Sequence, residues 1–310
     1  RFRNVTGVQT CALPIFQIGK EHLFVFDLRQ GFVHEDEAAL RLARAAAGPG
    51  LRLSEPSEGK VTLRAERDGL LCVDAEALKR LNSIEDMVFA TLHGRQQVRQ
   101  GQAVAGARVV PLVIEEEKLK RAEAVCAPGP LLQVKPFRTT RVGMVTTGSE
   151  VYHGRIQDGF GPVVRAKFEA LGSAVFRQVL VSDDEAMTAQ AILELLAEGA
   201  GMIVVTGGMS VDPDDRSPSA IRAAGARVVA YGAPVLPGAM FLLAFIGEVP
   251  VLGLPGCVMY HKASIFDLVV PRLLAGETVT REDIAGLGHG GFCAGCADCR
   301  YPLCPFGKGQ

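Results

Sequence analysis

The residues best suited to chemistry lie in two turns, each of which directly follows a short apolar run. The apolar runs 142–145 and 202–205 lead into the turns 146–150 and 206–215, which contain glycines, hydroxyls and carboxylates. Such runs are typical of buried strands that leave a sheet, and ligands of open α/β sheets bind at these carboxyl-end loops. Glycine lets the backbone approach an anion closely, and nearby amides and hydroxyls can hold phosphate oxygens. The pattern therefore predicts an anion-binding edge of a sheet.

Carboxylates in the same turns indicate that the pocket handles more than a phosphate. Glu150 ends the first turn, and Asp212, Asp214 and Asp215 crowd the second. Carboxylates this close repel one another unless cations or hydrogen-bond donors lie near them. They suit a pocket that also manages a metal ion, a water molecule or the amino groups of a ligand, and Asp215 is the first candidate for this role. For Glu150, a solvated loop acid is the alternative.

Alternating apolar and amphipathic segments after residue 131 predict the sheet that positions these turns. Strands are expected at 142–145, 174–181, 202–205, 227–230 and 250–254, and helices at 160–171, 186–198, 217–224 and 258–274. This alternation is typical of a largely parallel sheet with helices on both faces, an α/β fold. The preceding region, 16–135, predicts a smaller mixed α+β unit, in which Asp68 and Gly69 mark a hairpin between strands 60–64 and 70–73.

Charge and hydropathy exclude several classes of partner. The 33 basic residues balance 34 acidic ones, so we expect neither nucleic acid nor a membrane as a partner. The most apolar stretch, 241–254, is interrupted by Gly247, Glu248 and Pro250, whereas a membrane span needs about 20 continuous apolar residues. Residues 5–15 resemble the translation of a sequencing adapter. We therefore set residues 1–15 aside and expect the native N-terminus to be missing.

Four ordered motifs carry a family resemblance. Residues 146–150, 154–158, 206–210 with Asp215, and 254–256 resemble the molybdopterin-binding domain of molybdopterin molybdenumtransferases and adenylyltransferases of molybdenum-cofactor biosynthesis. The resemblance covers roughly residues 138–275. It implies a three-layer α/β/α domain over 136–276, followed by a Cys-rich tail over 277–310.

The resemblance also implies a set of site residues. Molybdopterin would contact the turns through Thr147, Gly148, Ser149, Asp158, Thr206, Gly207, Gly208, Ser210, Asp212, Pro237, Gly238, Pro255 and Gly256. Three acids, Glu150, Asp184 and Asp215, would act in catalysis with Mg²⁺. Asp184 has an equal alternative, because the run 182–184 can simply cap the helix that follows it.

Two departures from the family pattern leave the activity open. Ala239 stands where relatives carry a lysine, which removes a counter-charge for phosphate or molybdate, and Cys257 and Val258 replace an Asn-Pro pair. A catalytic protein would insert molybdate into adenylylated molybdopterin as a transferase. The alternatives are a non-catalytic molybdopterin carrier or sensor, and a redox protein. A cytoplasmic homo-oligomer that contacts other cofactor-biosynthesis proteins is expected.

Four cysteines crowd the end of the chain. Cys293, Cys296, Cys299 and Cys304 have nearly the spacing of a ferredoxin cysteine run, with one extra residue before the last cysteine. Four thiolates so close in sequence predict an iron–sulfur cluster or a structural Zn site. Disulfides and free thiols are the alternatives. Clustered thiols also favour a reducing compartment.

Overall fold

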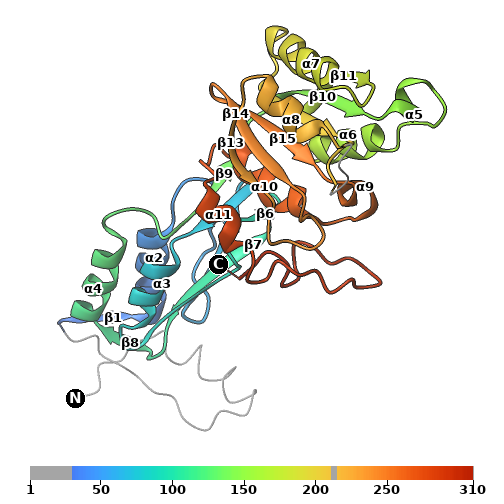
Figure 1. The fold of residues 1–310 in the computed structure, drawn as a ribbon. Helices are drawn as coiled ribbons and strands as arrows, with labels where there is room; N and C mark the ends of the chain where they lie inside the picture. The colour runs from blue at the N-terminus through green and yellow to red at the C-terminus, as the bar shows by residue number, and fades with distance from the viewer. Residues whose placement is uncertain (1–29, 211–214, 310) are drawn as a thin grey trace, which may run out of the picture.

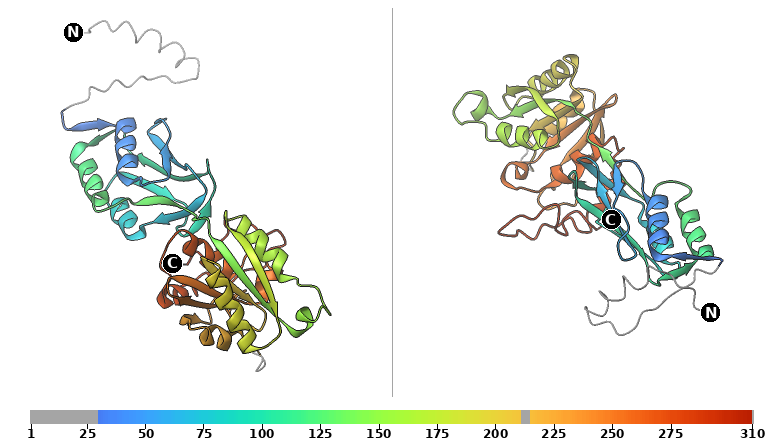
Figure 2. Two further views of the ribbon diagram at one scale, coloured as in Figure 1. Left: turned by 90° about the horizontal axis from the view of Figure 1, so that it is seen from above. Right: turned by 180° about the vertical axis from the view of Figure 1, so that it is seen from behind.

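The computed structural model describes residues 30–210 and 215–309. Figure 1 shows two lobes, which stay separate in the views of Figure 2. We call residues 30–136 the N-terminal lobe and residues 141–309 the C-terminal lobe. Each lobe has buried apolar clusters of its own, and they share no residue. The predicted boundaries at 135/136 and 276/277 stay predictions.

The N-terminal lobe mixes helices with three small antiparallel sheets. Its elements are β1 (Phe32–His34), α2 (Glu35–Ala46), β2 (Leu51–Leu53), β3 (Lys60–Ala65), β4 (Gly69–Val73), α3 (Ala75–Asn82), β5 (Met87–Thr91), β6 (Gln96–Val98), β7 (Ala103–Val109), β8 (Val113–Glu115), α4 (Glu116–Cys126) and β9 (Leu132–Pro136). The sheet orders are β1-β8, β2-β3-β7-β5 and β6-β4-β9. The mixed α+β prediction for this region is confirmed.

The predicted hairpin between β3 and β4 is wrong. β3 pairs with β2 and β7, whereas β4 pairs with β6 and β9. Gly69 is needed for a different reason, because a Cβ there would lie 2.3 Å from the Lys135 carbonyl oxygen. Asp68 turns toward the neighbouring loop, where its Oδ1 accepts a hydrogen bond from the Gln100 amide at 2.7 Å. An Asp-Gly pair therefore marks a turn here, but not a hairpin.

The C-terminal lobe contains the predicted sheet. Its strands are β10 (Arg141–Thr147), β11 (Ala174–Val181), β12 (Met202–Thr206), β13 (Arg227–Tyr231), β14 (Leu242–Ile246) and β15 (Val249–Leu254), in the order β11-β10-β12-β15-β14-β13. The four strands β11, β10, β12 and β15 are parallel, and β14 runs antiparallel to both of its neighbours. The stretch 241–254 forms the β14–β15 pair, with a turn at Gly247 and Glu248, where the apolar run is interrupted.

Helices cover both faces of this sheet (Figures 1 and 2). On one face lie α6 (Phe160–Glu169) and α10 (Ile265–Leu274), and on the other lie α7 (Glu185–Ala197) and α8 (Ser217–Ala223). Alternate residues of β12 divide between the two layers: Val204 belongs to the cluster under α6 and α10, and Ile203 to the cluster under α7 and α8. The three-layer α/β/α prediction is confirmed, because a strand buried on both faces must be apolar at every position.

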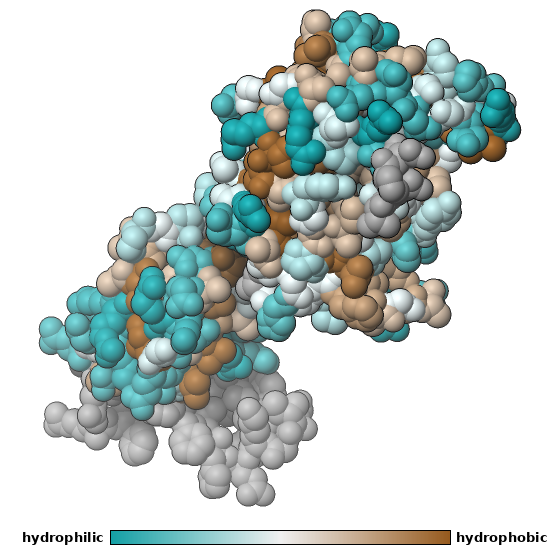
Figure 3. Space-filling model, viewed as in Figure 1, coloured by the Kyte–Doolittle hydropathy of each residue, from teal (hydrophilic) through white to brown (hydrophobic). Residues whose placement is uncertain are grey.

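Three short helices and the tail complete the lobe. They are α5 (Ser149–Tyr152), α9 (Cys257–Tyr260) and α11 (Arg281–Gly286). Residues 287–309 pack against the α10 layer, where Phe306 is 3% exposed and the Tyr301 hydroxyl donates to the Asp267 carbonyl oxygen at 2.8 Å. Figure 3 shows mostly apolar colours along the lower edge of this lobe, where the tail runs. In the described part of the chain, no helix has the length and apolar character that a membrane span requires.

Candidate functional site

The carboxyl ends of β10 and β12 bring two threonines together. Thr146 and Thr206 are register partners, and the Thr206 hydroxyl donates to the Thr146 Oγ1 at 3.0 Å. Gln178, on the neighbouring strand β11, donates through Nε2 to Thr146 Oγ1 at 2.9 Å and to Asp158 Oδ2 at 2.6 Å. The sequence prediction included Thr206 and Asp158 as contact residues, named Thr146 only as part of the motif 146–150, and missed Gln178. The side chain of Gln178 joins β11 to the loop after β10.

Asp158 holds the start of α6 in place. Its Oδ1 accepts from the Phe160 amide at 2.8 Å, and its Oδ2 accepts from the Gly161 amide at 2.9 Å. Together with the bond from Gln178, these contacts engage both carboxylate oxygens. Asp158 therefore fixes the loop that borders the site, because its short carboxylate side chain accepts hydrogen bonds from two backbone amides at the start of α6.

A tight glycine turn follows β12. Gly207 and Gly208 have φ values of +84° and +53°, which L-residues with side chains rarely adopt. A Cβ on Gly207 would lie 2.2 Å from the Thr147 carbonyl oxygen, and one on Gly208 would lie 2.9 Å from the Ser217 Oγ. Ser217, at the start of α8, donates to the Gly207 carbonyl oxygen at 2.8 Å and lies 3.5 Å from the Thr147 hydroxyl. Ser217 was missed by sequence reasoning, which used its segment only as a helix start.

The turn after β10 is tied to the loop after β11. The Ser149 amide donates to Asp183 Oδ2 at 2.8 Å, and the hydroxyls of Ser149 and Ser182 lie 3.0 Å apart. Glu150 is exposed on the short helix α5. In the run 182–184, the sequence predicted a site role only for Asp184. The structure shows that Asp183 is the residue that contacts Ser149.

The other predicted acids have different surroundings. Asp184 caps α7, because its Oδ1 accepts from the Met187 amide at 2.8 Å, so the capping interpretation is confirmed. A catalytic role for Asp184 stays a prediction. Asp215 accepts from the Ser210 amide at 2.5 Å, which links the two ends of the loop after β12. Asp212 lies outside the described residues, as does Asp214.

The two Pro-Gly loops occupy different places. Thr206 and Leu254 are register partners, so Pro255 and Gly256 leave the sheet beside the Gly207 turn. The Pro237 carbonyl oxygen accepts from the Ile265 amide at 3.2 Å, and a Cβ on Gly238 would lie 2.5 Å from the Ile265 Cβ. The Pro237–Gly238 loop thus packs against the start of α10.

The predicted metal sites receive no support from the structure. Within residues 30–210 and 215–309, no group of three or more His, Cys, Asp or Glu side chains could hold a metal ion. Cys293 and Cys304 are half-buried against the α10 layer, and Cys296 and Cys299 are exposed. The four cysteines line one cavity of 220 Å³, but proximity in sequence has not brought their sulfurs into a common coordination sphere. The described acids likewise form no group that could hold Mg²⁺.

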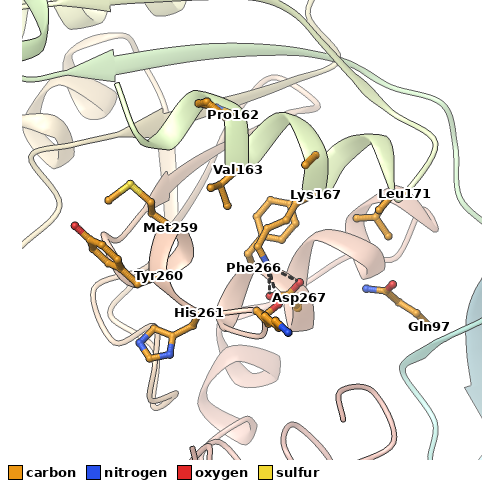
Figure 4. Close-up of a pocket in the computed structure, with 13 residues that line it drawn as sticks. Gln97, Pro162, Val163, Lys167, Leu171, Met259, Tyr260, His261, Phe266 and Asp267 are labelled. Atoms are coloured by element: carbon orange, nitrogen blue, oxygen red, sulfur yellow. Dashed lines mark hydrogen bonds and ion pairs between the residues drawn. The ribbon is translucent and has the colours of Figure 1, made fainter. Parts of the chain in front are cut away.

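A larger cavity lies on the α6 and α10 face (Figure 4). Its volume is 590 Å³, and Lys167 and Asp267 form an ion pair at 2.9 Å in its wall. Burial raises the pKa of the Asp267 carboxyl group, and the neighbouring Lys167 ammonium opposes that shift. None of the predicted molybdopterin-binding residues lines this cavity. Sequence reasoning missed it, because its lining comes from α6, from the segment 259–267 and from Gln97 of β6, which lie far apart in the sequence.

Comparisons with known proteins give a family match within the C-terminal lobe. The family described as "Probable molybdopterin binding domain" matches residues 143–275. The molybdopterin molybdenumtransferase of Staphylococcus aureus (strain COL) is 30% identical over 142 residues, which cover 44% of this chain and 34% of that protein. A CinA-like protein of Mycobacterium sp. (strain MCS) is 35% identical over 77 residues, 25% of this chain and 18% of that protein. The chain thus spans about a third or less of the length of these relatives.

Solved structures also resemble this chain. The molybdopterin biosynthesis enzyme MoaB of Thermus thermophilus has 23% identity and a TM-score of 0.36, over 45% of this chain and 98% of that one. The molybdopterin biosynthesis MoeA protein of Pyrococcus horikoshii has 18% identity and a TM-score of 0.37, over 79% of each chain. The residues that match the family described as "Probable molybdopterin binding domain", 143–275, contain the glycine turn after β12 and both Pro-Gly loops.

Proposed function

We propose that this protein binds molybdopterin in molybdenum-cofactor biosynthesis, across the loops that follow β10, β12 and β15. The turn at Gly207 and Gly208 is the observation that carries this proposal. It has two consecutive positive φ values and no room for a side chain against Thr147 and Ser217. Backbone bent in this way presents amides toward an anion, and the phosphate of molybdopterin is such an anion.

Hydroxyl and amide groups near this turn are also suited to binding molybdopterin. Ser210 is exposed after the glycines, and Ser149 begins α5 at the end of β10. These groups sit at the edge of a parallel sheet, where ligands of open α/β folds bind. Equilibrium titration of the purified protein with molybdopterin, without oxygen, tests the proposal. Saturable binding is expected, and its absence at ligand concentrations far above micromolar would contradict it.

Insertion of molybdate into adenylylated molybdopterin is the activity we propose for this site. Glu150 is exposed directly after β10, and Asp215 is held beside Ser210 in the loop after β12. These two acids, with Asp184, would orient water and the oxyanion while the adenylate is hydrolysed. The described residues do not fit a Mg²⁺ site, so no step is assigned to that ion.

A non-catalytic carrier is the second candidate. Ala239 favours it, because the loop at Pro237 and Gly238 carries no cation at the position where the family resemblance implies a lysine. Turnover separates the two candidates: an enzyme releases the metallated cofactor and the nucleotide when molybdate is added, whereas a carrier binds molybdopterin without turnover.

We expect the substitution Asp215→Asn to lower molybdate-dependent turnover by on the order of 100-fold. Asparagine can still accept from the Ser210 amide through its side-chain oxygen, so the loop keeps its shape while the charge is lost. Turnover and molybdopterin affinity are measured together, with the exposed Glu248→Gln as a charge-matched control. Unchanged turnover would remove Asp215 from the chemistry.

The substitution Ser210→Ala tests binding by itself. Loss of one hydrogen bond to a phosphate oxygen should weaken molybdopterin affinity by about 1 kcal/mol or somewhat more. Ser219→Ala is the matched control, because the Ser219 hydroxyl already donates to the carbonyl oxygen of Arg216, the N-cap of α8, at 2.8 Å. Equal affinities of the two variants would make Ser210 a turn residue only.

A further inference from the structure

The 590 Å³ cavity of Figure 4 is lined by none of the predicted molybdopterin-binding residues. One wall is the outer face of α6, where Pro162, Val163 and Ala166 face the cavity. Met259 and Tyr260 form the other side, and the floor includes Phe266, which is 1% exposed and stacks edge-on against Phe168 of α6. A volume of this size and an apolar lining are typical of sites for small molecules, which range over about 300–1,000 Å³.

The charged pair in this cavity is part of its wall and not a free binding group. Lys167 Nζ donates to both Asp267 carboxylate oxygens at 2.9 Å and to the Lys262 carbonyl oxygen at 3.0 Å. Asp267 Oδ2 also accepts from the Ser264 amide at 2.8 Å. These bonds use all three donors of Lys167. They also fix α6, α10 and the segment between α9 and α10 relative to one another, so the cavity is preformed.

The rim of the cavity carries polar groups of a different kind. Tyr260, His261 and Lys262 are consecutive, exposed and line the cavity. Among the described residues, no hydrogen bond or ion pair engages the side chains of His261 and Lys262. Tyr260 is 78% exposed, an unusual position for a large aromatic ring. A cationic, aromatic rim above an apolar floor is suited to a molecule that has both an anionic group and a flat ring.

We propose that this cavity binds a small anionic molecule with a flat, apolar ring system. The ring would lie across the outer face of α6, near the Met259 thioether and the exposed Tyr260 ring, because sulfur and aromatic edges contact ligand rings favourably. The anionic group would face the Lys262 ammonium. The lining residues differ from the predicted molybdopterin-binding residues, and the two regions meet where Met259 packs against Gly159, next to Asp158.

Anilinonaphthalene sulfonate is a probe with this chemistry, and the uncharged phenylnaphthylamine has the same rings without the charge. Fluorescence titration should show saturable binding of both probes to the full chain. The substitution Lys262→Gln should weaken the sulfonate about fivefold to tenfold and leave the uncharged probe unchanged. The substitution Ala166→Leu keeps good helix propensity but fills the cavity, so it should weaken both probes. Inorganic sulfate alone should compete poorly.

The exposed Lys60→Gln in the N-terminal lobe is the control for nonspecific charge effects, and thermal unfolding checks that each variant stays folded. Three results would each overturn the proposal: the same sulfonate affinity in wild type and Lys262→Gln, an equal loss with Lys60→Gln, or full binding of both probes to Ala166→Leu.

Discussion

Replacing Arg272 with leucine should lower the free energy of unfolding by about 3–5 kcal/mol. Arg272 is 2% exposed on α10, where its Nε donates to Glu277 Oε2 at 3.0 Å and its Nη2 to Asp283 Oδ1 at 2.9 Å. Lys135 and Arg95 of the N-terminal lobe pair with the same two carboxylates at 3.3 and 3.4 Å. Leucine would leave these acids without their central cation and weaken the joint between the lobes.

The pH dependence of the unfolding free energy tests whether this loss comes from the charges of Glu277 and Asp283. Burial by itself would raise the pKa of Glu277, but ion pairs with Arg272 and Lys135 outweigh it and lower that pKa, and the pKa of Asp283 is lowered likewise. A carboxyl group with a lowered pKa in the folded state stabilises the protein above its ordinary pKa. That contribution disappears as pH falls through the lowered value. Wild-type stability from these groups should therefore decline below about pH 4.5.

Urea unfolding of wild type and Arg272→Leu across a pH series measures both effects. The difference in unfolding free energy should narrow as pH falls, because protonated carboxyl groups no longer need the cation. Arg67→Leu is the matched control, since Arg67 is half exposed and lies 3.9 Å from Glu66, and it should change stability by less than about 1 kcal/mol. A difference for Arg272→Leu that is constant with pH would assign the loss to packing alone.

The substitution Gly207→Ala should weaken molybdopterin binding by on the order of 100-fold. A Cβ at this position would lie 2.2 Å from the Thr147 carbonyl oxygen, so the turn must move away from the end of β10. Displacement of a binding group by about 1 Å can cost this much. Titration with molybdopterin measures the effect directly.

Gly199→Ala provides a close control for that experiment. Gly199 has φ +85°, nearly equal to that of Gly207, but nothing lies within 4 Å of a Cβ built there. Both variants should therefore lose about 1–2 kcal/mol of stability from the left-handed backbone alone. Only Gly207→Ala should lose ligand affinity. If both variants bind molybdopterin as wild type does, the turn after β12 is not the binding element.

The sequence by itself determined the layered domain and the places where its loops meet. Strands such as β12 are buried on both faces and therefore read as continuous apolar runs. The starts of helices could also be predicted, because a capping side chain accepts from a backbone amide only two or three residues further along the chain. Asp184 caps α7 by accepting from the Met187 amide at 2.8 Å, as the capping interpretation of the run 182–184 predicted. The glycines of the turn after β12 were recognisable for the same local reason.

Only the tertiary structure decided which side chains meet. Gln178 contacts Thr146 and Asp158 because β11 lies beside β10. A local sequence pattern predicts neither the order nor the register of the strands in a sheet. The pairing of β4 with β9 instead of β3, and the burial of Arg272 between two acids, are of the same kind. For the tail cysteines, close spacing in the sequence predicted a shared metal site, but no such site is present among the described residues. Local patterns encode backbone preference and burial, whereas contacts between distant residues depend on the packing of the whole sheet.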